Sequence, residues 1–356
     1  MSASKDPKTG KWTMYVRYTD WQGERKAKKK MGFKTKKEAL EYEREFLAKK
    51  SKDLNMSFES FVEVYLRDIK PQIKLNTYLT KAQVINTHIL PYFRNKGLSE
   101  ITSTDVLQWQ NELLKRRDRE GKPYSDTYLR TIQNQLSAIF NHVVRYYDLL
   151  RNPCKKIKKM GKAKAKEMLF WTKDEYQKFA DVMVEKPVSY YAFELLYWTG
   201  IRVGELLALT RADFDIASRT LRIDKSFQHL NGEDYITTPK TEKSNRIIDL
   251  PEFLCYEMED YFEMLYKCDA DHRLFSITKS YLHHEMDRGH KAAGVKRIRI
   301  HDLRHSHVAH LIELGFSPVE IAERMGHESA DITYTYSHLY PSKQRKMADR
   351  LNEDRK

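Results

Sequence analysis

The sequence predicts a multidomain protein that is mainly α-helical and carries small β-sheets. Its length of 356 residues gives room for two or three domains, and 40% apolar residues suffice for packed cores. Residues 10–34 alternate apolar and polar side chains with a period of two, whereas long stretches from residue 55 onward have the spacing of amphipathic helices. Strand-like runs return only between residues 220 and 250, inside an otherwise helical region.

Residues 1–52 are predicted to form a small sheet backed by one helix. Residues 12–18 alternate like a strand, and residues 25–33 form a second, very basic strand after a turn that contains Gly23. Residues 36–48 then have helical spacing. The N-terminal segment is therefore expected to fold as a unit of its own.

Residues 55–152 are predicted to form a domain of four helices. The expected helices begin after a cap at Ser57, run over 77–89 to an end near Pro91, open at Thr104 and Asp105, and open at Ser125. Asn152 and Pro153 end the domain, because the residue before a proline disfavours helix. Residues 153–167 are predicted to be a basic linker whose low complexity cannot build a core.

Residues 168–356 are predicted to mix helices with a short sheet. Expected helices start at Thr172, cover 190–199, follow Arg202, cover 301–314 and start at Pro318, and a short one lies at 332–336. Three strands are expected at 220–223, 234–238 and 245–250. The last two would form a hairpin whose turn carries Lys240, and a polar tail follows at 341–356.

Positive charge is concentrated in two segments. The net charge is +14; residues 1–50 carry 15 basic and 7 acidic side chains, and residues 151–166 carry 8 basic and none acidic. The rest of the chain therefore sums to −2. Such clustering favours a polyanionic partner over a merely solvated surface. The expected DNA-binding residues are Arg17, Arg25, Lys26, Lys28, Lys155, Lys156, Lys158 and Lys159.

Other classes of protein are disfavoured. The three cysteines, Cys154, Cys255 and Cys268, form no Cys-x-x-Cys pair, which argues against a disulfide framework or a zinc ribbon. No apolar run approaches the roughly 20 residues of a membrane span, and the N-terminus lacks the apolar core of a signal peptide. We expect a cytoplasmic protein without a membrane partner.

Four motifs in the last half of the chain supply two arginines, two histidines and a tyrosine. They are Thr-Gly-Ile-Arg-Val-Gly-Glu-Leu at 199–206, His-Asp-Leu-Arg-His at 301–305, Met-Gly-His at 325–327 and Thr-Tyr-Ser-His at 335–338. Two guanidinium groups can hold the oxygens of a phosphate under attack. A histidine can move a proton, and a tyrosine hydroxyl can be the nucleophile. The set suits metal-independent chemistry on a DNA phosphodiester.

In these motifs the chain resembles the tyrosine recombinases, which include the integrases of phages and conjugative transposons. The family pattern is Arg…Lys…His-x-x-Arg…His…Tyr, and it is carried over onto Arg202, Lys240, His301, Arg304, His327 and the nucleophile Tyr336. Met325 stands where the family has leucine. By the same resemblance, residues 1–52 are an arm-type DNA-binding domain, residues 55–152 a SAM-like core-binding domain, and residues 168–356 the catalytic domain with its tail.

Three assignments leave alternatives open. Lys243 and Lys225 compete with Lys240 for the catalytic lysine, and Tyr334 competes with Tyr336. His301 and His305 have the i, i+4 spacing of metal ligands. No His-Glu-x-x-His and no nearby cysteine completes a zinc motif, so we expect no metal.

The resemblance implies a site-specific recombinase that integrates or excises a mobile element or prophage. Tyr336 would form a 3′-phosphotyrosyl bond while Arg202 and Arg304 stabilise the phosphate. His301 would act in acid–base catalysis, His327 would donate a hydrogen bond, and Lys240 would be the acid. The implied partners are double-stranded DNA at core and arm sites, three further protomers in a tetramer at a Holliday junction, a directionality factor and a host DNA-bending protein, without any cofactor. The rival functions are topoisomerase IB-like resealing and DNA binding without catalysis.

Overall fold

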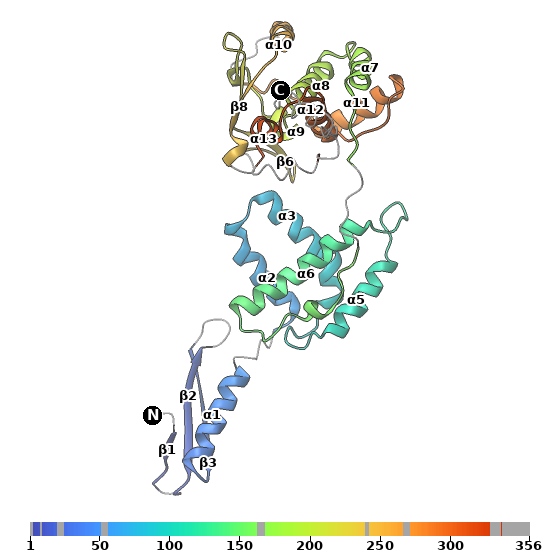
Figure 1. Cartoon of the computed structure of the whole chain (residues 1–356). Helices are drawn as coiled ribbons and strands as arrows, with labels where there is room; N and C mark the ends of the chain where they lie inside the picture. The colour runs from blue at the N-terminus through green and yellow to red at the C-terminus, as the bar shows by residue number, and fades with distance from the viewer. Residues whose placement is uncertain are drawn as a thin grey trace, which may run out of the picture. The chain divides into compact units, whose positions relative to one another are not determined.

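The computed structural model describes residues 3–7, 9–19, 25–50, 56–161, 168–238, 242–265, 271–327 and 336. Contacts divide the chain into two compact units, Met1–Ala165 and Lys166–Lys356. Among the described residues no helix is long and apolar enough to cross a bilayer. The architecture is helical with small antiparallel sheets, which confirms the predicted fold class (Figure 1).

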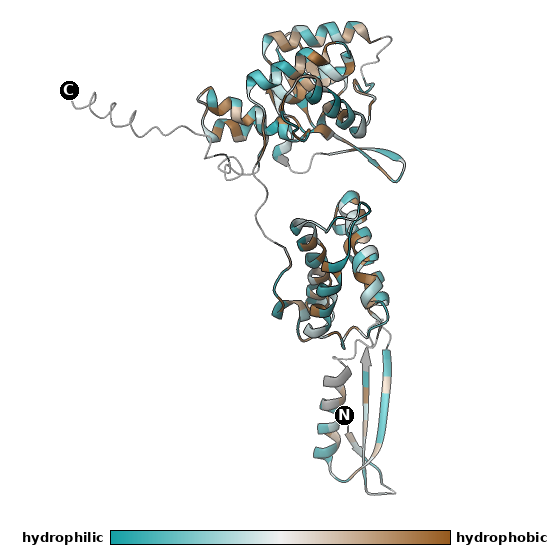
Figure 2. Cartoon of the chain, turned by 90° about the vertical axis from the view of Figure 1, so that its right-hand side faces the viewer, coloured by the Kyte–Doolittle hydropathy of each residue, from teal (hydrophilic) through white to brown (hydrophobic). Residues whose placement is uncertain are grey.

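The N-terminal sheet has the order β1-β2-β3 and is antiparallel throughout. Its strands are β1 (Ala3–Lys5), β2 (Trp12–Thr19) and β3 (Arg25–Phe33), and α1 (Lys36–Lys50) packs on one face. Met14 and Val16 of β2 are buried beneath Ala39 of α1, as the period of two predicted. The sheet is mostly hydrophilic in Figure 2. The alternation did not reveal β1, because it is only three residues long.

A helical domain follows the N-terminal sheet. It consists of α2 (Phe58–Ile69), a 3-10 helix (Lys70–Gln72), α3 (Leu75–Val84), a π-helix (Ile85–Ile89), α4 (Leu90–Phe93), α5 (Ser103–Lys115) and α6 (Asp126–Tyr146). Ser57 and Ser125 cap α2 and α6 as predicted. Thr102 caps α5, two residues before the predicted opening. Pro91 does not stop the second helix: the chain stays helical from α3 through the π-helix Ile85–Ile89 into α4, where Pro91 is the second residue.

Part of the predicted linker belongs to the helical domain. Pro153–Lys156 is a 3-10 helix, and the side chains of Cys154 and Met160 are buried in the helical core. The Met160 amide donates to Gln133 Oε1 at 2.6 Å. The prediction that this segment cannot contribute to a core is therefore wrong for residues 153–161. Residues 162–167 lie outside the described residues.

The second unit surrounds the apolar helix α8. Its helices are α7 (Lys173–Met183), α8 (Pro187–Thr199), α9 (Val203–Leu206), α10 (Glu252–Met264), α11 (Lys279–Ala292), α12 (Asp302–Glu313) and α13 (Pro318–Met325), with 3-10 turns at Arg211–Asp213 and Glu242–Ser244. Tyr176 of α7 and Tyr197 of α8 stack with ring centroids 3.6 Å apart. The expected helix at 332–336 and the tail at 341–356 lie outside the described residues, apart from Tyr336.

The strands of this unit do not pair as predicted. They are β4 (Phe214–Asp215), β5 (Thr220–Ile223), β6 (Ser226–Leu230), β7 (Glu233–Thr237) and β8 (Arg246–Asp249). One sheet has the order β4-β5-β8, and β6 pairs with β7 in a separate hairpin. The predicted hairpin over 234–250 is therefore wrong, because β7 turns back onto β6 and β8 joins β5.

Candidate active site

The end of α8 places Arg202. Gly200 ends the helix in the left-handed conformation with φ 66°. A Cβ at Gly200 would lie 2.8 Å from side-chain atoms of His307 and Met325, so the close packing requires glycine here. Arg202 then caps α9, and its backbone N–H donates to Glu205 Oε2 at 2.9 Å. The Thr-Gly-Ile-Arg motif is thus a tight turn that fixes the position of Arg202 at the start of α9.

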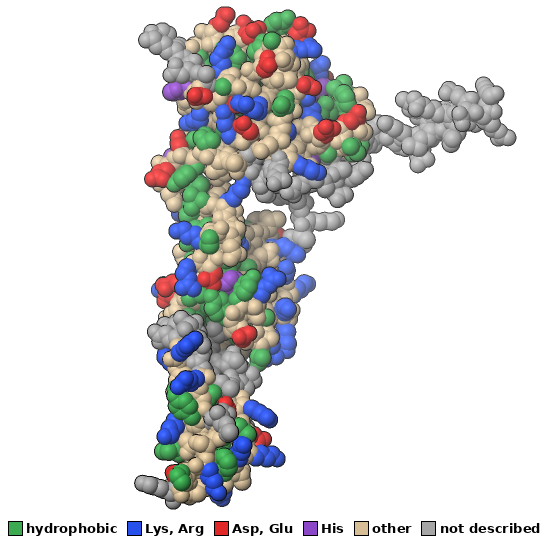
Figure 3. Space-filling view, turned by 90° about the vertical axis from the view of Figure 1, so that its left-hand side faces the viewer, with side chains coloured by type: hydrophobic (Ala, Val, Ile, Leu, Met, Phe, Trp, Pro, Cys, Tyr) green, Lys and Arg blue, Asp and Glu red, His purple; other side chains and the backbone are tan. Residues whose placement is uncertain are grey.

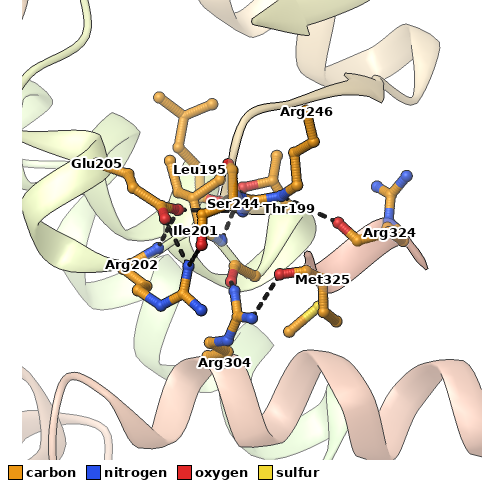
Figure 4. A network of polar contacts seen from close by, with 11 residues as sticks. Leu195, Thr199, Ile201, Arg202, Glu205, Ser244, Arg246, Arg304, Arg324 and Met325 are labelled. Atoms are coloured by element: carbon orange, nitrogen blue, oxygen red, sulfur yellow. Dashed lines mark hydrogen bonds and ion pairs between the residues drawn. The ribbon is translucent and has the colours of Figure 1, made fainter. Parts of the chain in front are cut away.

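A buried carboxylate holds two arginines at this turn. Glu205 Oε1 lies 2.7 Å from Arg202 Nη1, and Glu205 Oε2 lies 3.0 Å from Arg246 Nη2 (Figure 4). Burial alone would raise the pKa of Glu205, but Arg246 and Arg202 together lower it. The Arg202 side chain is 34% exposed and that of Arg246 only 6%. Arg202 therefore keeps access to a ligand, whereas Arg246 braces Glu205.

Arg304 reaches the same place from α12 and is buried. Its guanidinium donates to the Met325 carbonyl at 2.6 Å (Figure 4). It also donates to the Gly200 carbonyl at 2.7 Å. Burial, reinforced by the charges of Arg202 and Arg246, lowers the pKa of Arg304 to about 9, so the group is still a cation at pH 7. Two backbone carbonyls hold this arginine, and the nearby Glu205 carboxylate favours its charged form.

Two histidines of the motif set flank these arginines. Burial and the neighbouring His305 lower the pKa of His301 to about 4, although its side chain keeps contact with solvent. Burial and then Arg304 and Arg202 lower the pKa of His327 to about 4. Both imidazoles are therefore neutral at pH 7 and can donate or accept a hydrogen bond.

His327 is positioned by the end of α13. Gly326 ends this helix with φ 63°, and a Cβ there would lie 2.7 Å from the Lys243 carbonyl oxygen. The His327 amide donates to the Ala322 carbonyl at 2.9 Å. The glycine of the Met-Gly-His motif therefore lets the helix end lie against the segment that precedes β8.

Tyr336 lies in a small apolar cluster and is 5% exposed. Its ring packs with residues of α12 and α13, namely Val308, Ile312, Ile321 and Met325. The Tyr336 hydroxyl hydrogen-bonds His305 Nδ1. Burial raises the pKa of Tyr336 to about 12, against the opposing charge of Arg304. Tyr334, the alternative nucleophile, lies outside the described residues.

The three lysine candidates differ in what the structure describes. Lys240 lies outside the described residues. Lys225 Nζ lies 2.8 Å from the buried Asp213 and 3.1 Å from Thr210 Oγ1, so it is paired with the 3-10 turn Arg211–Asp213 and its cap. The Lys243 backbone lies against Gly326, next to His327. The motif order did not identify Arg246 or His305 as neighbours of the site. The one available signal was the position of His305, one helical turn after His301.

The expected DNA-binding residues of the N-terminal sheet lie on two faces. The register pairs Arg17 with Ala27 and Val16 with Lys28. Val16 is buried under α1, so Arg17 and Arg25 belong to the open face and Lys26 and Lys28 to the helix face. Lys28 Nζ accordingly lies 5.9 Å from the Phe46 ring of α1. Pairing places exposed Tyr15 beside Lys29 on the open face, and Lys29 is not among the predicted DNA-binding residues.

Lys155, Lys156, Lys158 and Lys159 are all exposed, on the ordered segment that packs on the helical domain. Figure 3 shows many Lys and Arg side chains and few acidic ones over the N-terminal part of the chain. Over the parts of the chain that are described, no three His, Cys, Asp or Glu side chains gather as metal ligands would.

Comparison with known proteins identifies the family. The Phage integrase family matches residues 170–343, the phage integrase N-terminal SAM-like domain matches residues 57–114, and the Arm DNA-binding domain matches residues 2–50. The ICEBs1 integrase of Bacillus subtilis (strain 168) is 31% identical over 339 residues, which make up 90% of each protein. The chain belongs to the phage integrase family and is a tyrosine-type site-specific recombinase, so the family predicted from the motifs is confirmed.

Solved structures share the fold. The Tn1549 transposon integrase in complex with transposon right end DNA has a TM-score of 0.66 at 17% identity, covering 84% of this chain and 99% of that one. A lambda integrase tetramer bound to a Holliday junction has a TM-score of 0.60 at 19% identity, covering 96% and 95%. At these identities the likeness concerns the fold.

Proposed function

We propose that this integrase cuts and rejoins DNA through a 3′-phosphotyrosyl bond on Tyr336. The observation that supports this most is the convergence of motif residues that are far apart in the sequence. Arg304 donates to the carbonyls of Gly200 and Met325, which lie two residues before Arg202 and His327. His305, the residue after Arg304, hydrogen-bonds the Tyr336 hydroxyl. Arg202 follows the end of α8, His327 follows the end of α13, and His301 and Arg304 lie at the start of α12.

The proposed roles follow from charge and burial. Arg202 and Arg304 hold the two non-bridging oxygens of the scissile phosphate, where negative charge grows in the transition state. His327 is neutral and donates a hydrogen bond to the same phosphate, and neutral His301 takes part in proton transfer. Lys240 is assigned by family resemblance as the acid that protonates the departing 5′ oxygen.

The two steps are transesterifications. The Tyr336 oxygen bonds to phosphorus as the bond from phosphorus to the 5′ oxygen breaks, and the 5′ oxygen leaves as a hydroxyl. A 5′ hydroxyl of the partner duplex then attacks the phosphotyrosine and releases the tyrosine. The energy of the phosphodiester is retained in the covalent intermediate, so the proposed cycle uses no ATP. Exchange of strands between two duplexes requires four protomers and passes through a Holliday junction.

The N-terminal domains are proposed to hold the DNA. Residues 2–50 match an arm DNA-binding domain, and the open face of their sheet carries Arg17, Arg25 and Lys29. The exposed Lys155, Lys156, Lys158 and Lys159 are proposed to contact phosphates of the core site. A directionality factor, a host DNA-bending protein and a cytoplasmic location belong to the same proposal.

A nicked core-site duplex tests the nucleophile. Cleavage next to the nick releases a short strand and traps the enzyme on DNA. We expect the wild-type chain and Tyr334→Phe to form the covalent adduct in excess EDTA. Tyr336→Phe should bind the DNA but form none. An adduct formed by Tyr336→Phe and absent from Tyr334→Phe would move the nucleophile to Tyr334.

A second duplex distinguishes recombination from topoisomerase-like resealing. Two intact core-site duplexes, one of them labelled, are incubated with the chain, so that the cleaved strand stays in place and can be resealed or exchanged. A recombinase should join the labelled strand to the cleaved one and form a four-armed junction. If only the original strand is resealed, the chain acts as a topoisomerase and not as an integrase.

A further inference from the structure

His305 lies between the proposed nucleophile and a buried carboxylate. It follows Arg304 on α12, and its side chain is 14% exposed. On one side, Nδ1 hydrogen-bonds the Tyr336 hydroxyl. On the other side, Nε2 lies 3.8 Å from Asp302 Oδ1. His305 therefore has the Tyr336 hydroxyl at one ring nitrogen and the Asp302 carboxylate near the other.

Asp302 is itself held in place by Arg299. The carboxylate is 1% exposed, and Arg299 binds it through Nη2 at 2.7 Å and through the backbone N–H at 2.8 Å. A tyrosine hydroxyl that donates to Nδ1 leaves the ring proton on Nε2, facing Asp302. A carboxylate on that side favours this tautomer. A hydroxyl, an imidazole and a carboxylate are the groups that activate hydroxyl nucleophiles in other enzymes, where the carboxylate hydrogen-bonds the imidazole; here these two groups are 3.8 Å apart.

We propose that His305 is the general base that removes the Tyr336 proton during strand cleavage, with Asp302 as its positioning residue. On attack, the hydroxyl proton passes to Nδ1 as the tyrosine oxygen bonds to phosphorus and the 5′ oxygen leaves. On rejoining, protonated His305 returns the proton to the departing tyrosine oxygen. The proton count balances over the cycle. The inference rests on the proposed function, since it names the base for that nucleophile.

The surroundings favour a neutral His305 and a protonated Tyr336 before the attack. Burial lowers the pKa of His305, against the opposing charge of Asp302, so the imidazole is free to accept a proton at neutral pH. Burial raises the pKa of Tyr336 to about 12, so the tyrosine does not ionise by itself. Arg304 and Arg299 add positive charge near His305, and the His301 ring contacts it with centroids 5.2 Å apart. Arg304 also stabilises the tyrosinate that forms.

His305→Asn separates the proton transfer from the hydrogen bond. The asparagine oxygen takes the place of Nδ1 and can accept the tyrosine hydroxyl, but it does not take up a proton. Full-length protein is mixed with a nicked core-site duplex, and the single-turnover rate of adduct formation is measured from pH 6 to pH 10. General-base catalysis contributes about 100-fold or more, so the variant should be about 100-fold slower at pH 7. Its defect should shrink as pH rises, because hydroxide ionises the tyrosine.

A change of leaving group shows whether His305 acts on the tyrosine nucleophile or on the departing 5′ oxygen. A substrate with sulfur in place of the bridging 5′ oxygen departs as a thiolate and needs no acid. This substrate should restore variants of the acid but leave His305→Asn slow. His310→Asn, on the same helix, is the matched control and should keep the wild-type rate. His305→Ala provides a second variant if the asparagine form is unstable. Added imidazole should raise its rate in proportion to the free base.

The outcomes separate the two proposals. Wild-type rates for His305→Asn would overturn the role of His305, as would an equal loss at every pH with no imidazole rescue of His305→Ala. Restoration of His305→Asn by the sulfur substrate would move His305 to the leaving group and also overturn it. In all these cases Tyr336→Phe still forms no adduct. An adduct in Tyr336→Phe would instead refute the proposed nucleophile.

Discussion

Replacing Glu194 by glutamine should change how the stability of the catalytic unit depends on pH. Glu194 of α8 is buried and accepts a hydrogen bond from the Tyr176 hydroxyl at 2.7 Å. Burial, with the nearby Glu257 carboxylate adding to it, raises the pKa of Glu194 from 4.5 to about 7. The folded state therefore keeps a proton that the unfolded chain releases above pH 4.5. This contribution to stability is complete below pH 4.5 and is lost as pH rises through about 7.

The size of the effect follows from the two pKa values. At about 1.4 kcal/mol per pH unit, a rise from 4.5 to about 7 corresponds to about 3 kcal/mol. Glutamine is neutral at every pH and still accepts the hydrogen bond from Tyr176. Glu194→Gln should therefore remove this loss between pH 5 and pH 8. For a unit of this size that amounts to a difference of roughly 5–10 °C in how the melting temperature responds to pH.

Calorimetry of the full-length chain at pH 5 and pH 8 measures this difference. The transition that the substitution shifts belongs to the catalytic unit. Glu259→Gln is the matched control, because Glu259 lies on the exposed side of α10. If Glu194→Gln and wild type lose melting temperature equally between the two pH values, Glu194 does not have a raised pKa in the folded state.

Four further predictions concern the site and the DNA interface. Glu205→Gln leaves Arg202 and Arg246 without their shared carboxylate, so it should cost about 3 kcal/mol of stability by calorimetry and slow adduct formation; unchanged stability would contradict the bridging role. Gly326→Ala should lower the melting temperature and adduct formation together, because its Cβ would meet the Lys243 carbonyl oxygen 2.7 Å away, whereas Gly232→Ala meets no atom within 4 Å and serves as a control for the left-handed backbone. Replacing Lys155, Lys156, Lys158 and Lys159 by glutamine should flatten the log–log dependence of DNA binding on salt by roughly 0.9 for each phosphate that is no longer neutralised, and an unchanged slope would remove these lysines from the interface. Arg17→Ala on the open face of the sheet should weaken arm-site binding more than Lys28→Ala on the helix face, and the reverse order in a binding titration would contradict the assigned faces.

Local signals in the sequence predicted helix starts well. Ser57, Ser125 and Thr172 each cap the helix that they were expected to cap, because a cap depends on residues three positions away. Strand pairing was predicted less well. The pairing of β8 with β5 joins segments more than 20 residues apart, and alternation within a strand does not specify its partner. The lysines around Cys154 and Met160 make this segment polar in composition, so the sequence did not indicate that these two side chains are buried.

The order of the motifs identified residues of the candidate site but not the residues that hold them in place. Arg202, Arg304, His301 and His327 were selected by their position in motifs, and the structure gathers them. Arg246 and His305 were not selected, because their part in the site depends on tertiary contacts with Glu205 and Tyr336. Their roles could be inferred only after those contacts were known.

Tyr336 is proposed to carry the DNA during recombination. The most direct measurement is mass spectrometry of the adduct trapped on a nicked core-site duplex, after digestion of the protein and of the DNA. We predict a nucleotide joined through its 3′ phosphate to the peptide that contains Tyr336, with fragment ions that place it on that tyrosine. A nucleotide on Tyr334, on Tyr340 or on a residue other than tyrosine would contradict it.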